Sequence, residues 1–485
     1  MRVIFLNEKN LKWASCCNLS TSCLDCDHSV SCERWYDYVS NHRDKKGYAH
    51  FDKRTSLGDW KTRAKVLDPS WVAHHSFWPL IHSDMPRGKF GTMAGSEDPM
   101  FKKKTRSIRY CSHIDRCVYQ RYAFLINEAY DLRVANTAID NCSIAYRANK
   151  GLNNISFAKE AFGFIRRQEA CIVVVSDFSD FFEGVDHAYL KESLCALLGC
   201  EELPPDYYAV YKNATRYSCW EWRDLLKLNG LSTDRAARSK MNGLEVVLPY
   251  EVFKQHVKVK TTRNDSGIGI PQGSPLSAVL SNVYLLELDG KLSTLVGEFG
   301  GMYRRYCDDL LIVLPVGEGG IDLAMEQVGE MFKRIEAYPG ANLQQEKTAC
   351  YLLDRLGGSP CLYEVDDQGK VGTEPKELDY LGFSFDGLHA RVRAKTVGKY
   401  YYRMRRKARN ALRKGAGMTR LYANYSEKSW EIDGRGSFVD YARRASRTMN
   451  LKDPITTSIA KHSMEKIAKT INRLRVDSGS RDHSR

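Results

Sequence analysis

The sequence predicts a mixed α/β fold that ends in a small basic helical domain. Three observations predict this class. β-Branched runs at 170–177 and 310–315 have the composition of buried strands, and each lies beside carboxylates. Apolar residues recur at helical spacing over 274–288 and 321–337. The window 391–420 holds 12 Lys and Arg and no Asp or Glu.

The composition indicates which class of partner and which cellular compartment to expect. The chain has 485 residues, of which 43% are hydrophobic, so we expect a globular protein of about two to four structural units. The 73 Lys and Arg exceed the 59 Asp and Glu, and a net charge of +14 favours nucleic acid as partner. The longest apolar runs are much shorter than the ~20 residues of a membrane span, and the N-terminus lacks a signal-peptide pattern. We therefore expect a cytoplasmic protein with no membrane partner.

The first 95 residues show no clean periodicity, although their tryptophans predict a packed segment. A cysteine-rich stretch at 16–32 contains five thiols and one histidine, namely Cys16, Cys17, Cys23, Cys26, Cys32 and His28. The spacing of Cys23 and Cys26 is typical of metal ligands, which leaves a structural Zn²⁺ open. Because no second CxxC pair follows, free thiols are the preferred interpretation.

Carboxylates mark the ends of two predicted strands in the middle of the chain. Asp177 closes the run at 170–177, and Asp308 with Asp309 lies where 304–313 predicts a strand, a tight turn and a second strand. Carboxylates beside apolar strands are costly unless a cation neutralises them. Mg²⁺ prefers such oxygens, and two ions can support in-line phosphoryl transfer. Taken alone, an Asp-Asp pair is also compatible with an ordinary polar turn.

The last 95 residues predict helices. Tyr401, Met404, Ala408 and Leu412 recur at spacings of three and four, which indicates a helix over 399–414 whose other faces are basic. Apolar patterns around 438–445 and 459–471 indicate two more helices. Residues 380–385 indicate a third strand between the middle region and this helical domain.

Five segments, taken in order, resemble the palm motifs of reverse transcriptases. They are SDFSDFFEGVDHAYL at 176–190, GIPQGSPLSAVLSN at 269–282, YCDD at 306–309, LQQEKT at 343–348 and YLGF at 380–383. Upstream, KKKTRSIRYCSHIDRCVYQRYA at 102–123 and AYRANKG at 145–151 resemble the fingers motifs of bacterial reverse transcriptases of the retron, group II intron and defence-associated groups.

The resemblance implies a right-hand polymerase, with an α+β palm, fingers and a basic helical thumb. On it we expect an N-terminal extension at 1–95, fingers at 96–168, a palm at 169–390 and a thumb at 391–485. Residues 200–265 exceed what a compact palm needs, and we interpret them as an insertion.

The resemblance also assigns roles to individual residues. It implies a catalytic set of Asp177, Asp308, Asp309 and Lys347, and a site for two Mg²⁺ ions, with Mn²⁺ as a substitute, at Asp177, Phe178 and Asp308. For the incoming nucleotide it implies Phe182, Gln272, Arg106, Arg147 and Lys104, with Lys150 as a weaker candidate. For the template and primer it implies Gly273, Ser274, Pro275, Tyr306, Tyr380, Gly382, Arg403, Arg406 and Lys407.

Several of these roles have ordinary structural alternatives. Phe182 would exclude a 2′-hydroxyl by size, or it is simply a core residue. Arginine forks suit triphosphate oxygens, but surface basic residues are common. A Pro-Gly helix start explains residues 272–275 equally well without the neighbouring motifs.

The expected function is RNA-directed synthesis of DNA from dNTPs on a dedicated non-coding RNA, in antiviral defence. A template-independent or protein-primed nucleotidyl transferase has the same palm chemistry and stays open. An RNA polymerase is disfavoured by Phe182, and a non-catalytic RNA-binding scaffold is a remote alternative. A homo-oligomer is left open, and the sequence identifies neither the template nor the primer.

Overall fold

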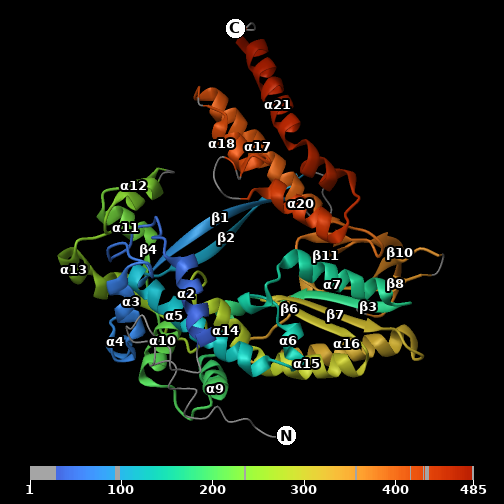
Figure 1. The fold of residues 1–485 in the computed structure, drawn as a ribbon, viewed down its shortest axis with the longest axis horizontal. Coiled ribbons are helices and arrows are strands. Elements are labelled where there is room, and N and C mark those ends of the chain that lie inside the picture. The colour runs from blue at the N-terminus through green and yellow to red at the C-terminus, as the bar shows by residue number, and fades with distance from the viewer. Residues whose placement is uncertain are drawn as a thin grey trace.

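The computed structural model describes residues 29–482, apart from 93–98, 234–235, 356–357, 367, 416, 430 and 432–435. Figure 1 shows three regions: a central sheet, a body on the N-terminal side of it, and a set of C-terminal helices above both. The predicted mixed fold, with helices packed on a palm-like sheet, is confirmed.

The central sheet has six strands in the order β10-β9-β8-β3-β7-β6, and all its pairings are antiparallel. Its strands are β3 (Cys171–Asp177), β6 (Met302–Tyr306), β7 (Asp309–Pro315), β8 (Ala349–Asp354), β9 (Cys361–Val365) and β10 (Val371–Lys376).

Both faces of the central sheet are buried, which explains why β3 is apolar without interruption. Ile172 and Val174 point into one core, which includes residues of α16 (Gly320–Glu336). Cys171 and Val173 point into a second core, which includes residues of α7 (Asn154–Arg167). Because side chains alternate along a strand, a run buried on both faces must be apolar at every position. α14 (Ser277–Tyr284) and α15 (Leu286–Glu298) also pack into the first core.

A small three-stranded sheet joins the central sheet to the C-terminal helices. It consists of β11 (Leu378–Tyr380), β12 (Phe383–Phe385) and β13 (Ala390–Val392). The single strand predicted over 380–385 is therefore wrong. Leu381 and Gly382 both have positive φ values, of 47° and 92°, and they turn the chain into a hairpin.

The predicted C-terminal helices are present as α17 (Ala394–Arg413), α18 (Thr419–Tyr425), α20 (Phe438–Met449) and α21 (Pro454–Asp482). α17 buries Tyr400, Met404 and Ala408 in the second core and leaves its basic faces exposed. Its apolar stripe matches the predicted one at Met404 and Ala408, while Tyr401 and Leu412 lie at the margin of that core.

The N-terminal side holds a four-stranded sheet in the order β2-β1-β4-β5. Its strands are β1 (Leu80–Thr92), β2 (Pro99–Tyr110), β4 (Ser218–Glu221) and β5 (Thr261–Arg263). The helices around it and below it are α2 (Ser29–His42), α3 (Trp60–Leu67), α4 (Pro69–His74), α5 (His113–Val134), α9 (His187–Leu198), α10 (Pro205–Thr215), α11 (Trp222–Leu228), α12 (Ala237–Gly243) and α13 (Tyr250–Lys260). By contrast, α6 (Ile139–Cys142) packs on α15 and on β6 of the central sheet, and α8 (Phe181–Gly184) follows β3.

Strand pairings in this second sheet cross two of the predicted domain boundaries. The boundary at residue 95 falls between β1 and β2, which pair with each other. The predicted insertion at 200–265 supplies β4 and β5 to the same sheet. A third core, centred on Trp220, contains residues from both segments, and we call it the Trp220 core: Ala49, Phe51, Ile81, Trp220, Leu225, Leu226, Ala237, Met241, Val247 and Leu248.

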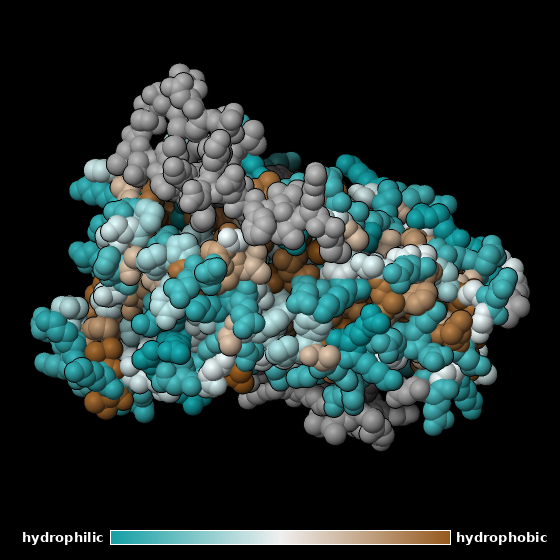
Figure 2. Space-filling view, turned by 90° about the horizontal axis from the view of Figure 1, so that it is seen from below, coloured by the Kyte–Doolittle hydropathy of each residue, from teal (hydrophilic) through white to brown (hydrophobic). Residues whose placement is uncertain are grey.

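The surface is largely hydrophilic on the face seen in Figure 2, and its hydrophobic patches are small and separate. Within the described part of the chain, no helix is both long and apolar enough to cross a membrane.

Candidate active site

The three predicted catalytic carboxylates meet at one edge of the central sheet. β3 ends at Asp177, and the antiparallel register pairs Asp177 directly with Asp309, the first residue of β7. Asp308 lies in the turn between β6 and β7, and its carbonyl accepts a hydrogen bond of 3.1 Å from the Phe178 backbone N–H. The hairpin predicted from the sequence is therefore present and carries Asp308 and Asp309, and the pairing of β3 with β7 brings Asp177 beside them.

The charges at this edge act on one another strongly. Burial raises the pKa of the Asp309 carboxyl, and a hydrogen bond to Asp177 and the negative charges of Asp177 and Asp308 raise it further. Lys347, in a 3₁₀ helix over Gln345–Lys347, forms an ion pair with the Asp177 carboxylate. The edge is thus a cluster of carboxylates that repel each other and favour a cation.

A buried ion pair supports the turn from behind. The Arg305 and Asp289 side chains are both fully buried, and Arg305 Nη2 lies 2.6 Å from Asp289 Oδ2. Arg305 Nη1 also donates a 3.0 Å hydrogen bond to the carbonyl of Cys307, whose φ of 62° makes the sharp turn before Asp308. Sequence reasoning missed Arg305, although two adjacent arginines in a short predicted strand were a usable signal.

The segment around Gln272 lies beside the segment that carries Phe182. The Ile270 N–H donates to the Phe182 carbonyl over 2.7 Å, and Gln272 Nε2 lies 3.4 Å from Glu183 Oε2. Phe182 is half-buried at the margin of the first core. These contacts bring together two of the predicted nucleotide-binding residues.

Gly273 and its neighbours have a structural explanation of their own. The φ of Gly273 is 117°, and a Cβ there would lie 2.7 Å from the Arg109 carbonyl on β2, so no side chain fits. Ser274 is buried, and its hydroxyl accepts from the Leu276 N–H over 3.2 Å as the chain enters α14. Pro275 is half-buried in the same turn.

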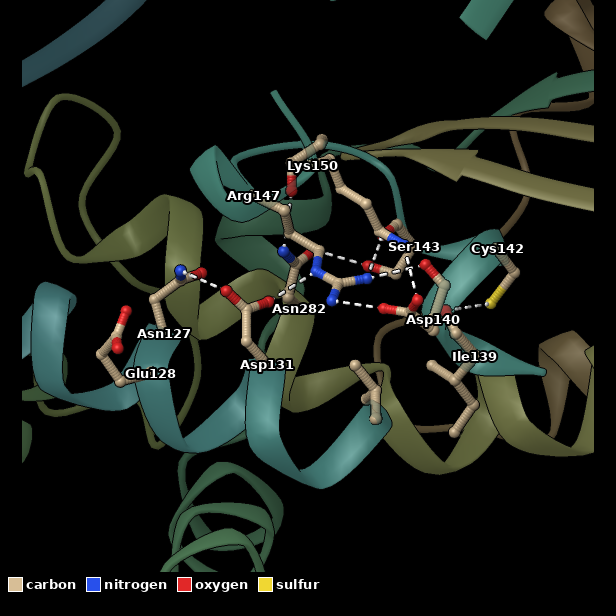
Figure 3. Close-up of polar contacts among 12 residues, drawn as sticks. Asn127, Glu128, Asp131, Ile139, Asp140, Cys142, Ser143, Arg147, Lys150 and Asn282 are labelled. Carbon is tan, nitrogen blue, oxygen red and sulfur yellow. Dashed lines mark hydrogen bonds and ion pairs between the residues drawn. The ribbon is translucent and has the colours of Figure 1, made fainter. Parts of the chain in front are cut away.

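The structure corrects the prediction that Arg147 binds a triphosphate. Figure 3 shows its guanidinium turned towards two carboxylates inside the protein. Arg147 Nε lies 2.7 Å from Asp131 Oδ1, Nη2 lies 2.7 Å from Asp140 Oδ1, and the Arg147 side chain is fully buried. The weaker candidate Lys150 also pairs with Asp140, at 2.7 Å.

Other predicted residues are spread around the site. Tyr380 is buried in the second core, so its ring offers no surface to a duplex, which corrects that assignment. Gly382 lies in the β11–β12 turn, and Tyr306 is half-buried beside Asp309 at the end of β6. Arg106 is exposed on β2, and Lys104 lies on the same strand. Exposed basic side chains on α17 include Arg403, Arg406 and Lys407.

The proposed Zn²⁺ site falls almost wholly outside the described residues, which begin at Ser29 in α2. In the part of the chain that the structure describes, no group of three or more His, Cys, Asp or Glu side chains forms a ready-made metal cage.

Comparisons with known proteins were made on sequence and on structure. No family model matches the chain. Over 126 residues, or 26% of the chain, it is 31% identical to the Retron Mx65 reverse transcriptase of Myxococcus xanthus. This stretch spans about a quarter, 27%, of that relative's length. The match confirms the resemblance to bacterial retron-type reverse transcriptases.

Two solved structures show distant similarity. One is apo telomerase from Candida tropicalis truncated from the C-terminal domain, with 10% identity and a TM-score of 0.38 over 70% of this chain and 61% of that one. The other is telomerase from Candida albicans in complex with a fragment of telomeric RNA, with 14% identity and a TM-score of 0.36 over 91% of this chain and 61% of that one.

Proposed function

We propose that this protein is an RNA-directed DNA polymerase that adds dNTPs to the 3′-hydroxyl of a primer. The observation that carries the proposal is the meeting of Asp177, Asp308 and Asp309 at the edge of the central sheet. The partial identity to a retron reverse transcriptase supports it.

The carboxylates suit divalent metal ions of the magnesium type. Burial raises the pKa of Asp309, and the neighbouring carboxyl groups raise it further, so positive charge added at the site would be stabilising. Mg²⁺ typically binds to one or two carboxylates and keeps waters and substrate phosphates as its remaining ligands. Asp177 and Asp308 would hold two ions, with the Phe178 backbone beside them. Bound there, two ions activate an attacking hydroxyl and stabilise the leaving oxygen.

The chain's own residues then position the reactants. In the reaction, the primer 3′-oxygen bonds to the α-phosphate of the dNTP, the bond to the β-phosphate oxygen breaks, and pyrophosphate leaves. Lys347 lies at the carboxylates, where its ammonium group can neutralise or protonate the departing pyrophosphate. The half-buried Phe182 ring would lie under the sugar and exclude a 2′-hydroxyl by size, with Gln272 beside it.

The exposed basic faces of α17 would hold the template–primer duplex through its phosphates. This contact is electrostatic and reads no sequence. From the resemblance to retron and defence-associated enzymes, we also propose that the template is a dedicated non-coding RNA and that the protein acts in antiviral defence.

A primer-extension assay tests the proposal. Purified protein with Mg²⁺, an RNA template and a DNA primer is expected to incorporate dNTPs and to discriminate against NTPs. Asp177→Asn is expected to abolish incorporation, whereas Asp322→Asn, at an exposed position of α16, is the matched control and keeps wild-type activity. A covalent protein–DNA adduct would instead support protein priming, and binding of RNA without any incorporation would support a scaffold. Sequencing the nucleic acids that copurify from cells identifies the template.

A further inference from the structure

Tyr146 adopts a backbone conformation that a bulky side chain rarely accepts. Its φ is 62°, in the left-handed region, where glycine and asparagine are the usual residues. Such strain persists only where the surroundings impose it, and it is concentrated at functional sites. The residue lies in the segment 143–147, which connects α6 to the short 3₁₀ helix Ala148–Lys150.

Buried contacts fix this segment on both sides of Tyr146. Before it, the Ile144 N–H donates 3.0 Å to the Arg305 carbonyl, and the Ala145 carbonyl accepts 3.0 Å from Asn282 Nδ2. After it, Arg147 is bound to Asp131 and Asp140 inside the protein (Figure 3). Arg147, which was expected to contact a triphosphate, is instead buried and anchors this segment.

The anchors place Tyr146 at the catalytic turn. Ser143 forms a parallel bridge with Arg305, so the chain that follows it runs alongside the turn at 306–308. The Tyr146 side chain lies within electrostatic reach of Cys307 and Asp308, and burial and these two residues raise the pKa of its hydroxyl. Nevertheless 47% of the Tyr146 surface is exposed, so part of this side chain is accessible to a ligand.

We propose that Tyr146 contacts the terminal base pair of the template–primer duplex. This inference rests on the proposed function. The reacting 3′-hydroxyl must lie at Asp177 and Asp308, so the last base pair of the duplex lies beside the turn that carries Asp308. An exposed aromatic ring held at this turn can pack on that base pair without reading its sequence, because every base has an apolar face.

Because the backbone at Tyr146 is strained, substitutions there can distinguish a contact with the duplex from a purely structural role. Tyr146→Gly removes the ring and also relieves the positive φ, so the variant is expected to fold with at least wild-type thermal stability. At the same time it is expected to raise the KM for the template–primer about tenfold, with little change in kcat. A side chain that only packs against Cys307 would show the opposite pattern, with lower stability and an unchanged KM.

Two further variants complete the experiment. Tyr146→Phe keeps the ring and is expected to keep the wild-type KM; a loss as large as that of the glycine variant would show that the hydroxyl acts on the turn, and would overturn the proposal. Asn136→Gly relieves a similar φ of 60° at an exposed position and is the matched control, with unchanged KM. If the glycine variant does not fold, Tyr146→Asn replaces it, because asparagine tolerates this conformation without a ring.

Failure of this inference is separable from failure of the proposed function. An inactive wild-type protein contradicts the function. An active wild-type protein whose Tyr146→Gly variant has the same KM contradicts the inference alone.

Discussion

The turn that carries Asp308 and the Trp220 core differ in how far apart their interacting parts lie along the chain. β6 and β7 are neighbours in sequence and form a hairpin that carries Asp308. In the Trp220 core, Phe51 and Trp220 are separated by more than a third of the chain, yet their rings pack at a centroid distance of 5.3 Å. Asp308 thus lies on a local hairpin, whereas Asp177 reaches it only through the pairing of β3 with β7, which lie far apart in the sequence.

The buried pair of Arg305 and Asp289, beside the turn at 306–308, should give the largest effect. Arg305→Leu leaves the Asp289 carboxylate buried without its partner, and we expect a loss of about 4 kcal/mol in the free energy of unfolding. Nucleotide incorporation should be lost as well, because the Cys307 carbonyl loses its donor. Urea unfolding and a primer-extension assay measure the two effects.

The exposed pair of Arg334 and Glu330 on α16 is the control for Arg305. Arg334→Ala is expected to cost less than about 0.5 kcal/mol and to leave incorporation unchanged. Equal losses from the two arginine variants would contradict the supporting role of the buried pair.

Trp220→Ala should destabilise the Trp220 core. Removing this fully buried ring is expected to cost about 3 kcal/mol. Because the cavity lies in the Trp220 core, hydrogen–deuterium exchange should rise first in β4 and α11, while β3 and β7 stay protected. Trp60→Ala, at a ring that is 65% exposed, is the control. A uniform rise of exchange across both regions would show that the two cores unfold as one.

Lowering the pH should reduce the free energy of unfolding, through groups on the N-terminal side, by less than these substitutions do. Burial, together with the nearby His113, lowers the pKa of His50 from 6.5 to about 3. The unfolded chain therefore binds a proton below pH 6.5 that the folded chain does not, so stability present above pH 6.5 is lost as the pH falls. We expect a loss of about 1 kcal/mol between pH 6.5 and 5.5 from this group.

Thermal unfolding of His50→Gln across this range checks the assignment. This variant should lose part of the pH dependence, whereas His74→Gln, at an exposed position, should keep it. Identical pH profiles for wild type and His50→Gln would contradict it.

The difference between the two regions also explains which features the sequence could predict. Asp177 and Asp308 were predictable because a buried strand and a tight turn are local patterns. The partners of Arg147 were not, because α5 and α6 bring Asp131 and Asp140 to it only in the folded chain. The strands at 218–221 and 261–263 were missed for the same reason, since they are short and the first of them pairs with β1, which lies far away in the sequence.

Motif spacing likewise predicted which segments meet, but not what every side chain does there. Gly273 has its φ of 117° because β2 passes too close for a Cβ, a contact that no local pattern reveals. Tyr380 belongs to a motif and is nevertheless buried among core residues.

Single-nucleotide incorporation by wild type and Asp308→Asn, on an RNA template with a DNA primer and Mg²⁺, tests the central claim most directly. The account predicts addition of the templated dNTP by the wild type. It predicts a loss of at least about 10³-fold in the variant, whose thermal unfolding should be unchanged. A folded Asp308→Asn protein that extends the primer at the wild-type rate would contradict it.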